Sequence, residues 1–135
     1  MTIGRLVVLA VAAGLSLSAA PSAHHSSSAF DTGKKLVLKG VVKQWIYSNP
    51  HCFLMIEVKN DAGEPVQWVA ETQAPSVIFP AGYRRDTFKP GEVVSVTVEP
   101  FKDGRPFGRI LQTQLPDGTT LGVAGSPPAA SVQAP

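Results

Sequence analysis

Cysteine is almost absent from this sequence, because Cys52 is the single one among 135 residues. One cysteine cannot close an intramolecular disulfide, and it excludes a cysteine-rich zinc site. A dominant charge of one sign is missing as well, because 12 Lys and Arg stand against 10 Asp and Glu. A dedicated nucleic-acid binder needs a concentrated basic surface, so this balance argues against a nucleic-acid partner.

Catalytic motifs are also missing. The sequence has no nucleophile elbow and no phosphate-binding glycine loop, and its acidic residues are scattered without a pair suited to acid–base chemistry. We therefore expect a non-enzymatic binding or interaction module rather than an enzyme. Its expected partner is a small ligand, a metal ion or another periplasmic protein.

The apolar run at residues 6–17 is too short for a transmembrane helix, which needs ~20 residues. Arg5 precedes the run, and residues 18–23 are all small or proline. A positive start, a short apolar stretch and a small-residue cleavage zone are typical of a bacterial Sec-type secretory signal peptide. We predict that residues 1–23 are this signal, that the mature chain is periplasmic or secreted, and that it keeps no stable membrane span.

The mature chain divides into three parts by composition. Residues 24–33 are polar and contain two histidines, which predicts a flexible arm. Residues 124–135 consist mainly of small residues and proline, which predicts a disordered tail. Residues 34–123 hold β-branched, apolar segments separated by turn residues, which predicts the folded domain.

Six strands and one helical turn are expected in that domain. Alternation of apolar and polar residues, as in 51–59 and 93–99, indicates antiparallel sheet with one buried face. Gly40 suggests a bulge or a sharp bend within its strand. Three strands, a helical interruption near 74–85 and further strands follow the order of an OB-fold, so we predict an all-β, small OB-like five- to six-stranded antiparallel barrel, with a six-stranded sandwich as the alternative. The expected strands are 36–47, 51–59, 66–72, 93–99, 109–115 and 119–123.

An ordered set of short segments resembles the secreted bacterial family called domain of unknown function 6152. The matching pieces are HHS at 24–26, SNPH at 48–51, Trp68, RDTFKPGE at 85–92 and DGTTL at 117–121. The resemblance implies an exported or periplasmic β-barrel and no assigned reaction, so it supplies no catalytic residues. The family tends to have Val or an aromatic residue after the histidine, whereas this sequence has Cys52-Phe53. This difference argues against Cys52 as a functional thiol shared by the family.

The three histidines suggest a metal site, with copper as the candidate cofactor. If the signal is cut after Ala23, His24 offers both its α-amino nitrogen and its imidazole; if it is cut after Ser22, His25 becomes the third residue behind a free amine. His51 could add another nitrogen, and Met55 on the same strand face a thioether. Such a nitrogen-rich set suits Cu(II). The alternative is that His25 is solvated and that His51 only hydrogen-bonds its turn.

Three further groups have a functional and a structural interpretation. The aromatic residues could line an OB-type ligand face, or they could fill the barrel core. Cys52 shares its strand face with Leu54 and is expected to be a small core residue. The basic residues near the helical turn could hold an anion, or they could form an ordinary solvated surface. The aromatic set is Trp45, Tyr47, Phe53 and Trp68, and the basic set is Arg84, Arg85 and Lys89.

Overall fold

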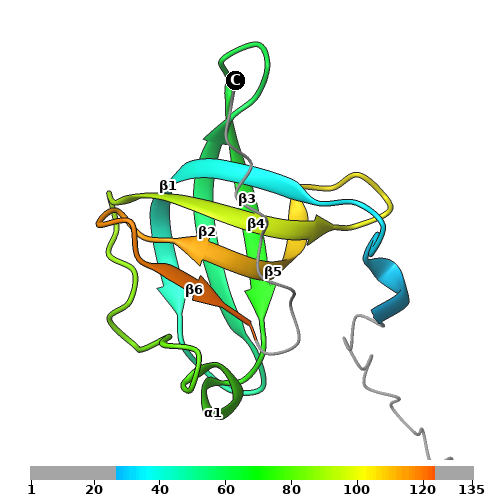
Figure 1. Ribbon diagram of the computed structural model, residues 1–135. Coiled ribbons are helices and arrows are strands. Elements are labelled where there is room, and N and C mark those ends of the chain that lie inside the picture. Colours follow the sequence, from blue (N-terminus) through cyan, green and yellow to red (C-terminus); the bar gives the residue numbers. More distant parts are fainter. Residues whose placement is uncertain (1–26, 124–135) are drawn as a thin grey trace, which may run out of the picture.

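The computed structural model describes residues 27–123 of the chain. Six strands form one sheet that closes on itself, and a short helix covers one end (Figure 1). The predicted signal peptide and C-terminal tail lie outside the described residues. The elements are η1 (Ser27–Ala29), β1 (Leu36–Ile46), β2 (Cys52–Lys59), β3 (Pro65–Thr72), α1 (Pro75–Ile78), β4 (Val93–Pro100), β5 (Phe107–Gln114) and β6 (Thr120–Gly122).

The sheet has the strand order β3-β2-β1-β4-β5-β6, and an additional pairing of β3 with β5 closes a five-strand barrel. β6 is an outer strand paired with β5. The position of α1 between β3 and β4 matches the expected OB-like arrangement, so the predicted fold class is confirmed. The closing β3–β5 pair is parallel, which makes the barrel mixed. Five strands in a ring cannot all alternate in direction, so at least one neighbouring pair has to be parallel.

The core follows the alternation read from the sequence. Cys52, Leu54 and Ile56 of β2 are fully buried, and so are Val96 and Val98 of β4. Inward side chains at every second position are the geometric consequence of the pleated strand. Burial of these aliphatic side chains from both halves of the barrel is the main stabilising contribution to a domain of this size.

Gly40 lies at a close approach of two strands rather than at a bulge. It pairs with Val58 of β2 and with Val94 of β4, and the register shift of β1 falls between Val42 and Gln44. A Cβ atom at position 40 would lie 2.7 Å from the carbonyl oxygen of Glu57. Only glycine therefore fits here without displacing backbone.

The start of the described chain is attached to the barrel. Phe30 forms a β-bridge with Phe101, and its side chain is only 5% exposed. The backbone N–H of Asp31 donates to the carbonyl of Pro100 at 2.8 Å, and that of Lys102 donates to the carbonyl of Ala29 at 3.0 Å. From residue 27 onward, the segment predicted as an arm thus lies against the connection between β4 and β5.

Candidate functional site

His51 is positioned by the short connection between β1 and β2. The Asn49–Pro50 peptide bond in this connection is cis. His51 directly precedes β2, whose first residue, Cys52, points into the core. Because neighbouring side chains of a strand point to opposite faces, the imidazole of His51 and the ring of Phe53 share the outer face, with ring centroids 6.5 Å apart.

Glu71 of β3 holds the imidazole of His51. The Nδ1 atom of His51 is in hydrogen-bond contact with Oε1 of Glu71. An ionised carboxylate only accepts hydrogen bonds, so Nδ1 is the donor and carries the proton. In the neutral ring this leaves the lone pair on Nε2. Within residues 27–123, Nε2 has no hydrogen-bond partner, and the His51 side chain is 44% exposed, whereas that of Glu71 is 9% exposed.

A polar row continues from Glu71 across the outside of the barrel. Glu71 pairs in register with Arg109 of β5, and Arg109 pairs in register with Glu99 of β4. Nε of Arg109 donates to Oε2 of Glu99 at 3.0 Å, and a second guanidinium nitrogen contacts the same oxygen. Residues paired in register project from the same side of a sheet. We call His51, Glu71, Arg109 and Glu99 the outer row.

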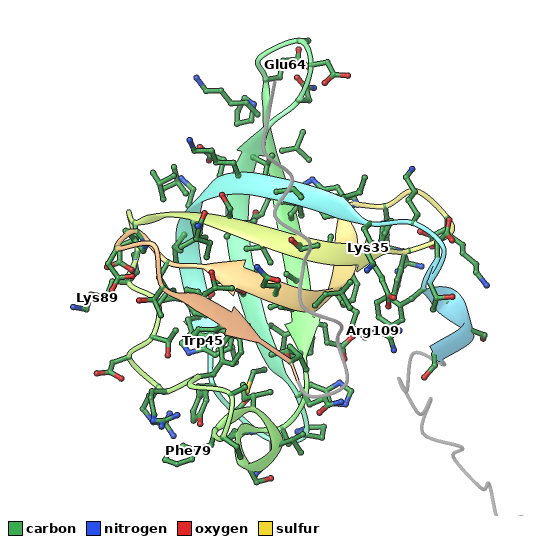
Figure 2. All side chains as sticks on the ribbon, in the orientation of Figure 1. Lys35, Trp45, Glu64, Phe79, Lys89 and Arg109 are labelled. Atoms are coloured by element: carbon green, nitrogen blue, oxygen red, sulfur yellow. The ribbon has the colours of Figure 1, made fainter. Side chains whose placement is uncertain are left out.

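Phe30 covers part of the outer row. Its ring centroid lies 5.0 Å from the guanidinium carbon of Arg109, and its ring packs edge-on against Phe101 with 4.7 Å between centroids. A guanidinium over an aromatic ring is a favourable cation–π contact. The Arg109 side chain is 37% exposed beside Phe30, and that of Glu99 is 11% exposed. The described chain begins at Ser27, two residues after His25. Phe30 therefore fixes the start of this chain beside Arg109 (Figure 2).

The predicted metal ligands do not all come together in the described part of the chain. His24 and His25 lie outside residues 27–123. Met55 is on the outer face like His51, but it lies four residues further along the extended chain. The Cα atoms of the two residues are therefore roughly 13 Å apart. One ion cannot bridge that distance, so Met55 and His51 are not co-ligands within β2. Within residues 27–123 there is no group of three or more His, Cys, Asp or Glu side chains able to hold a metal ion.

The four aromatic candidates do not share one face. Trp45 pairs in register with Leu54, and Trp68 pairs with Ile56, so both tryptophans project from the face of the sheet that carries the core. Trp45 packs edge-on against Phe88 at 4.9 Å, while its Nε1 donates to the carbonyl of Arg84. Trp45, Tyr47 and Trp68 are partly buried against the core. Phe53 alone lies on the outer face.

The remaining candidates have structural contacts. Cys52 is buried, its Sγ lies 3.7 Å from the carbonyl oxygen of Ser48, and burial raises the pKa of its thiol. A protonated buried thiol is a small core group and no nucleophile. Arg84 donates to the carbonyls of Phe79 and Tyr83. Arg84 lies on the ring of Phe79, whereas Lys89 lies away from Phe79, shortly before the start of β4 (Figure 2). The three basic residues therefore do not form one cluster.

Sequence reasoning did not single out Glu71, Glu99 and Arg109. Each is a charged residue inside a strand, and Glu71 and Glu99 are buried. Charged residues are rarely buried unless they are paired. The sequence gives no separate signal for Glu71, because a charged residue at an alternating position of the strand 66–72 also fits a solvent-exposed face.

Fold and site together define a class: a small OB-like barrel with an ordered histidine–carboxylate pair on its outer face. No helix among residues 27–123 is long and apolar enough to cross a membrane. The model of a family of unknown function, DUF6152, matches residues 12–110, and the chain belongs to that family. No curated protein and no solved structure matches the chain.

Proposed function

We propose that this chain is an exported binding module of the periplasm or the extracellular space, and that its ligand is a Cu(II) ion. His51 supplies one ligand through Nε2, and the amino-terminal histidines His24 and His25 supply the others. The observation that carries the proposal is the contact of Nδ1 of His51 with Glu71, which leaves Nε2 available at the surface.

The histidine–carboxylate pair is the arrangement that metal-ligating histidines use. Such histidines usually donate their other ring N–H to a carboxylate or carbonyl, which fixes the tautomer and the ring orientation. Glu71 is suited to this role because it belongs to a strand and is almost fully buried, whereas His51 remains half exposed. The pair thus presents a preoriented nitrogen to the solvent.

The amino-terminal histidines are the natural co-ligands. The chain has three histidines in total, and within residues 27–123 His51 is the only one. Phe30 anchors the chain beside Arg109, which is in register with the Glu71 that holds His51. The Cα atom of His25 lies at most roughly 7 Å from the Cα atom of Ser27, because only two residues separate them. Imidazole and amine nitrogens together favour Cu(II) over harder cations.

The test uses protein exported with its own signal and purified from the periplasm. Its intact mass gives the mature amino terminus, and Cu(II) titration followed by visible absorption and electron paramagnetic resonance gives stoichiometry and ligand type. We expect one copper per chain with nitrogen ligation. His51→Ala is expected to change the spectrum, and Glu71→Gln to weaken Cu(II) binding about 10- to 100-fold while leaving the spectrum similar.

Met55→Leu is the matched control, because Met55 lies on the same face but out of reach of His51. It is expected to bind copper like the unsubstituted protein. A mature chain without a visible copper band would overturn the proposal. A band that is unchanged in His51→Ala would show that the amino-terminal peptide binds copper alone, and His51 would then have no part in the site.

A further inference from the structure

One end of the barrel exposes apolar side chains on a protruding segment. α1 and the residues after it lie at this end, beside the connection between β1 and β2, as Figure 1 shows. Phe79, directly after α1, is 52% exposed, and Val77 within α1 is 44% exposed. We call Val77 and Phe79 the apolar tip. Val77 and Phe79 are the two neighbours of the buried Ile78, so they lie on two sides of one helical turn, and both are exposed at this end of the barrel.

Arginine side chains border the apolar tip. The guanidinium carbon of Arg84 lies 3.6 Å from the ring centroid of Phe79, and that of Arg85 lies 5.5 Å from the ring centroid of Tyr47. Within residues 27–123 neither arginine takes part in a salt bridge. Residues 74–88 contain two basic residues and one acidic residue, Asp86, which gives this stretch a net charge of +1, and Lys89 lies away from the apolar tip.

The opposite end of the barrel has a different character. The hairpin loop between β2 and β3 contains Asp61 and Glu64, and it projects away from the end that bears Phe79 (Figure 2). Acidic groups at one end and arginines with apolar groups at the other would orient the molecule toward an anionic surface.

We propose that the apolar tip docks on the surface of an anionic phospholipid bilayer. Val77 and Phe79 enter the interfacial region, and Arg84 and Arg85 face lipid phosphates. The guanidinium group of Arg84 lies over the Phe79 ring, and one of its nitrogens donates to the carbonyls of Phe79 and Tyr83. Its other N–H groups are left to face lipid phosphate beside the ring. A protruding, convex tip with flanking cations fits a lipid surface, whereas an extended peptide needs a groove or an open strand edge.

The test is co-sedimentation of the mature protein with vesicles of phosphatidylcholine alone or mixed with phosphatidylglycerol. We expect binding to the mixed vesicles that weakens with added salt, and much weaker binding to phosphatidylcholine alone. Phe79→Ser is expected to weaken binding to mixed vesicles about tenfold or more. Arg85→Gln is expected to weaken it about fivefold. Circular dichroism of each variant verifies that the barrel is folded.

Val37→Ser is the matched control, because Val37 on β1 is a 72% exposed valine far from the apolar tip in the sheet. It is expected to bind vesicles like the unsubstituted protein. Equal binding to both vesicle types would overturn the proposal, and so would unchanged binding of Phe79→Ser. If a soluble acidic polypeptide binds as well as the vesicles do and needs Phe79 equally, the surface recognises a protein, and the lipid assignment is wrong.

Discussion

Tyr83 gives the most direct test of how the segment after α1 is held on the barrel. Its side chain is fully buried, and its hydroxyl lies 3.2 Å from both Oγ1 of Thr113 and the carbonyl oxygen of Leu121. Burial raises the pKa of Tyr83 from 10.0 to about 12, although the hydrogen bond with Thr113 acts in the opposite direction. The folded state therefore favours the protonated phenol.

The sign and size of the effect follow from proton linkage. In the unfolded chain the phenol ionises near its ordinary pKa of 10.0, while in the folded protein it stays protonated until about pH 12. Between these values the folded state binds more protons than the unfolded state, so stability falls as pH rises. One pKa unit corresponds to 1.36 kcal/mol, so the loss approaches about 2.7 kcal/mol above pH 12.

The assay is urea unfolding followed by circular dichroism at pH values from 8 to 12, for the unsubstituted protein and for Tyr83→Phe. At pH 8 the variant is expected to be less stable by about 1 kcal/mol, because a buried hydrogen bond is lost. Other groups titrate equally in both proteins, so the difference between them isolates Tyr83. That difference should reverse sign by pH 12. Thr113→Val is the control: it removes the hydrogen bond and keeps the alkaline loss.

Parallel stability curves for the unsubstituted protein and Tyr83→Phe would contradict a raised pKa of Tyr83 in the folded protein. They would mean that the hydroxyl of Tyr83 is hydrated in the folded protein. The segment after α1 would then not seal the barrel end in the way that the contact with Leu121 indicates.

Three further predictions concern the barrel and the outer row. Gly40→Ala should lower the free energy of unfolding by about 1–3 kcal/mol, because the added Cβ would meet backbone atoms of Glu57. Gly122→Ala is the control and should be neutral, because a Cβ there has nothing within 4 Å, and equal urea midpoints of the two variants would contradict the prediction. Arg109→Met should cost about 2–4 kcal/mol by leaving Glu99 unpaired, and adding Glu99→Gln should restore more than half; an additive double variant would count against the pairing. Phe30→Ala should cost about 3 kcal/mol and expose the first described residues to limited proteolysis, and resistance equal to that of the unsubstituted protein would disprove the anchoring role.

Much of the fold could be predicted because the strands are locally encoded. The alternation in β2 placed Cys52 inside and His51 outside, and both placements agree with the pairing of β2 with β3. The expectation of a bulge or a sharp bend agrees with the strand that contains Gly40, because β1 passes there from pairing with β4 to pairing with β2 and has a register shift between Val42 and Gln44. The close approach of backbone at Gly40 itself was not predicted, because it depends on the neighbouring strands, and Gly40 contacts one on each side.

The partner of His51 was harder to foresee, although the hairpin contained the information. Lys59 pairs with Pro65, and the same register places Phe53 opposite Glu71. His51 is then a diagonal neighbour of Glu71, a separation that long side chains can bridge. A one-residue change in the hairpin register would have turned Glu71 to the other face, so the pair could be identified only once the register was known.

The position of the amino-terminal segment depends on closure of the whole barrel. A ring of five strands brings β3 beside β5 in parallel, and this places Arg109 next to Glu71 and Glu99. Phe30 can pack under Arg109 only after that closure, and the chain that carries His24 and His25 is attached through Phe30. If copper binding needs His51 and the amino-terminal histidines together, Phe30→Ala should weaken it without removing any ligand. A site made by the amino-terminal peptide alone would keep its affinity, so this one variant separates a site assembled by the fold from one that the peptide contains by itself.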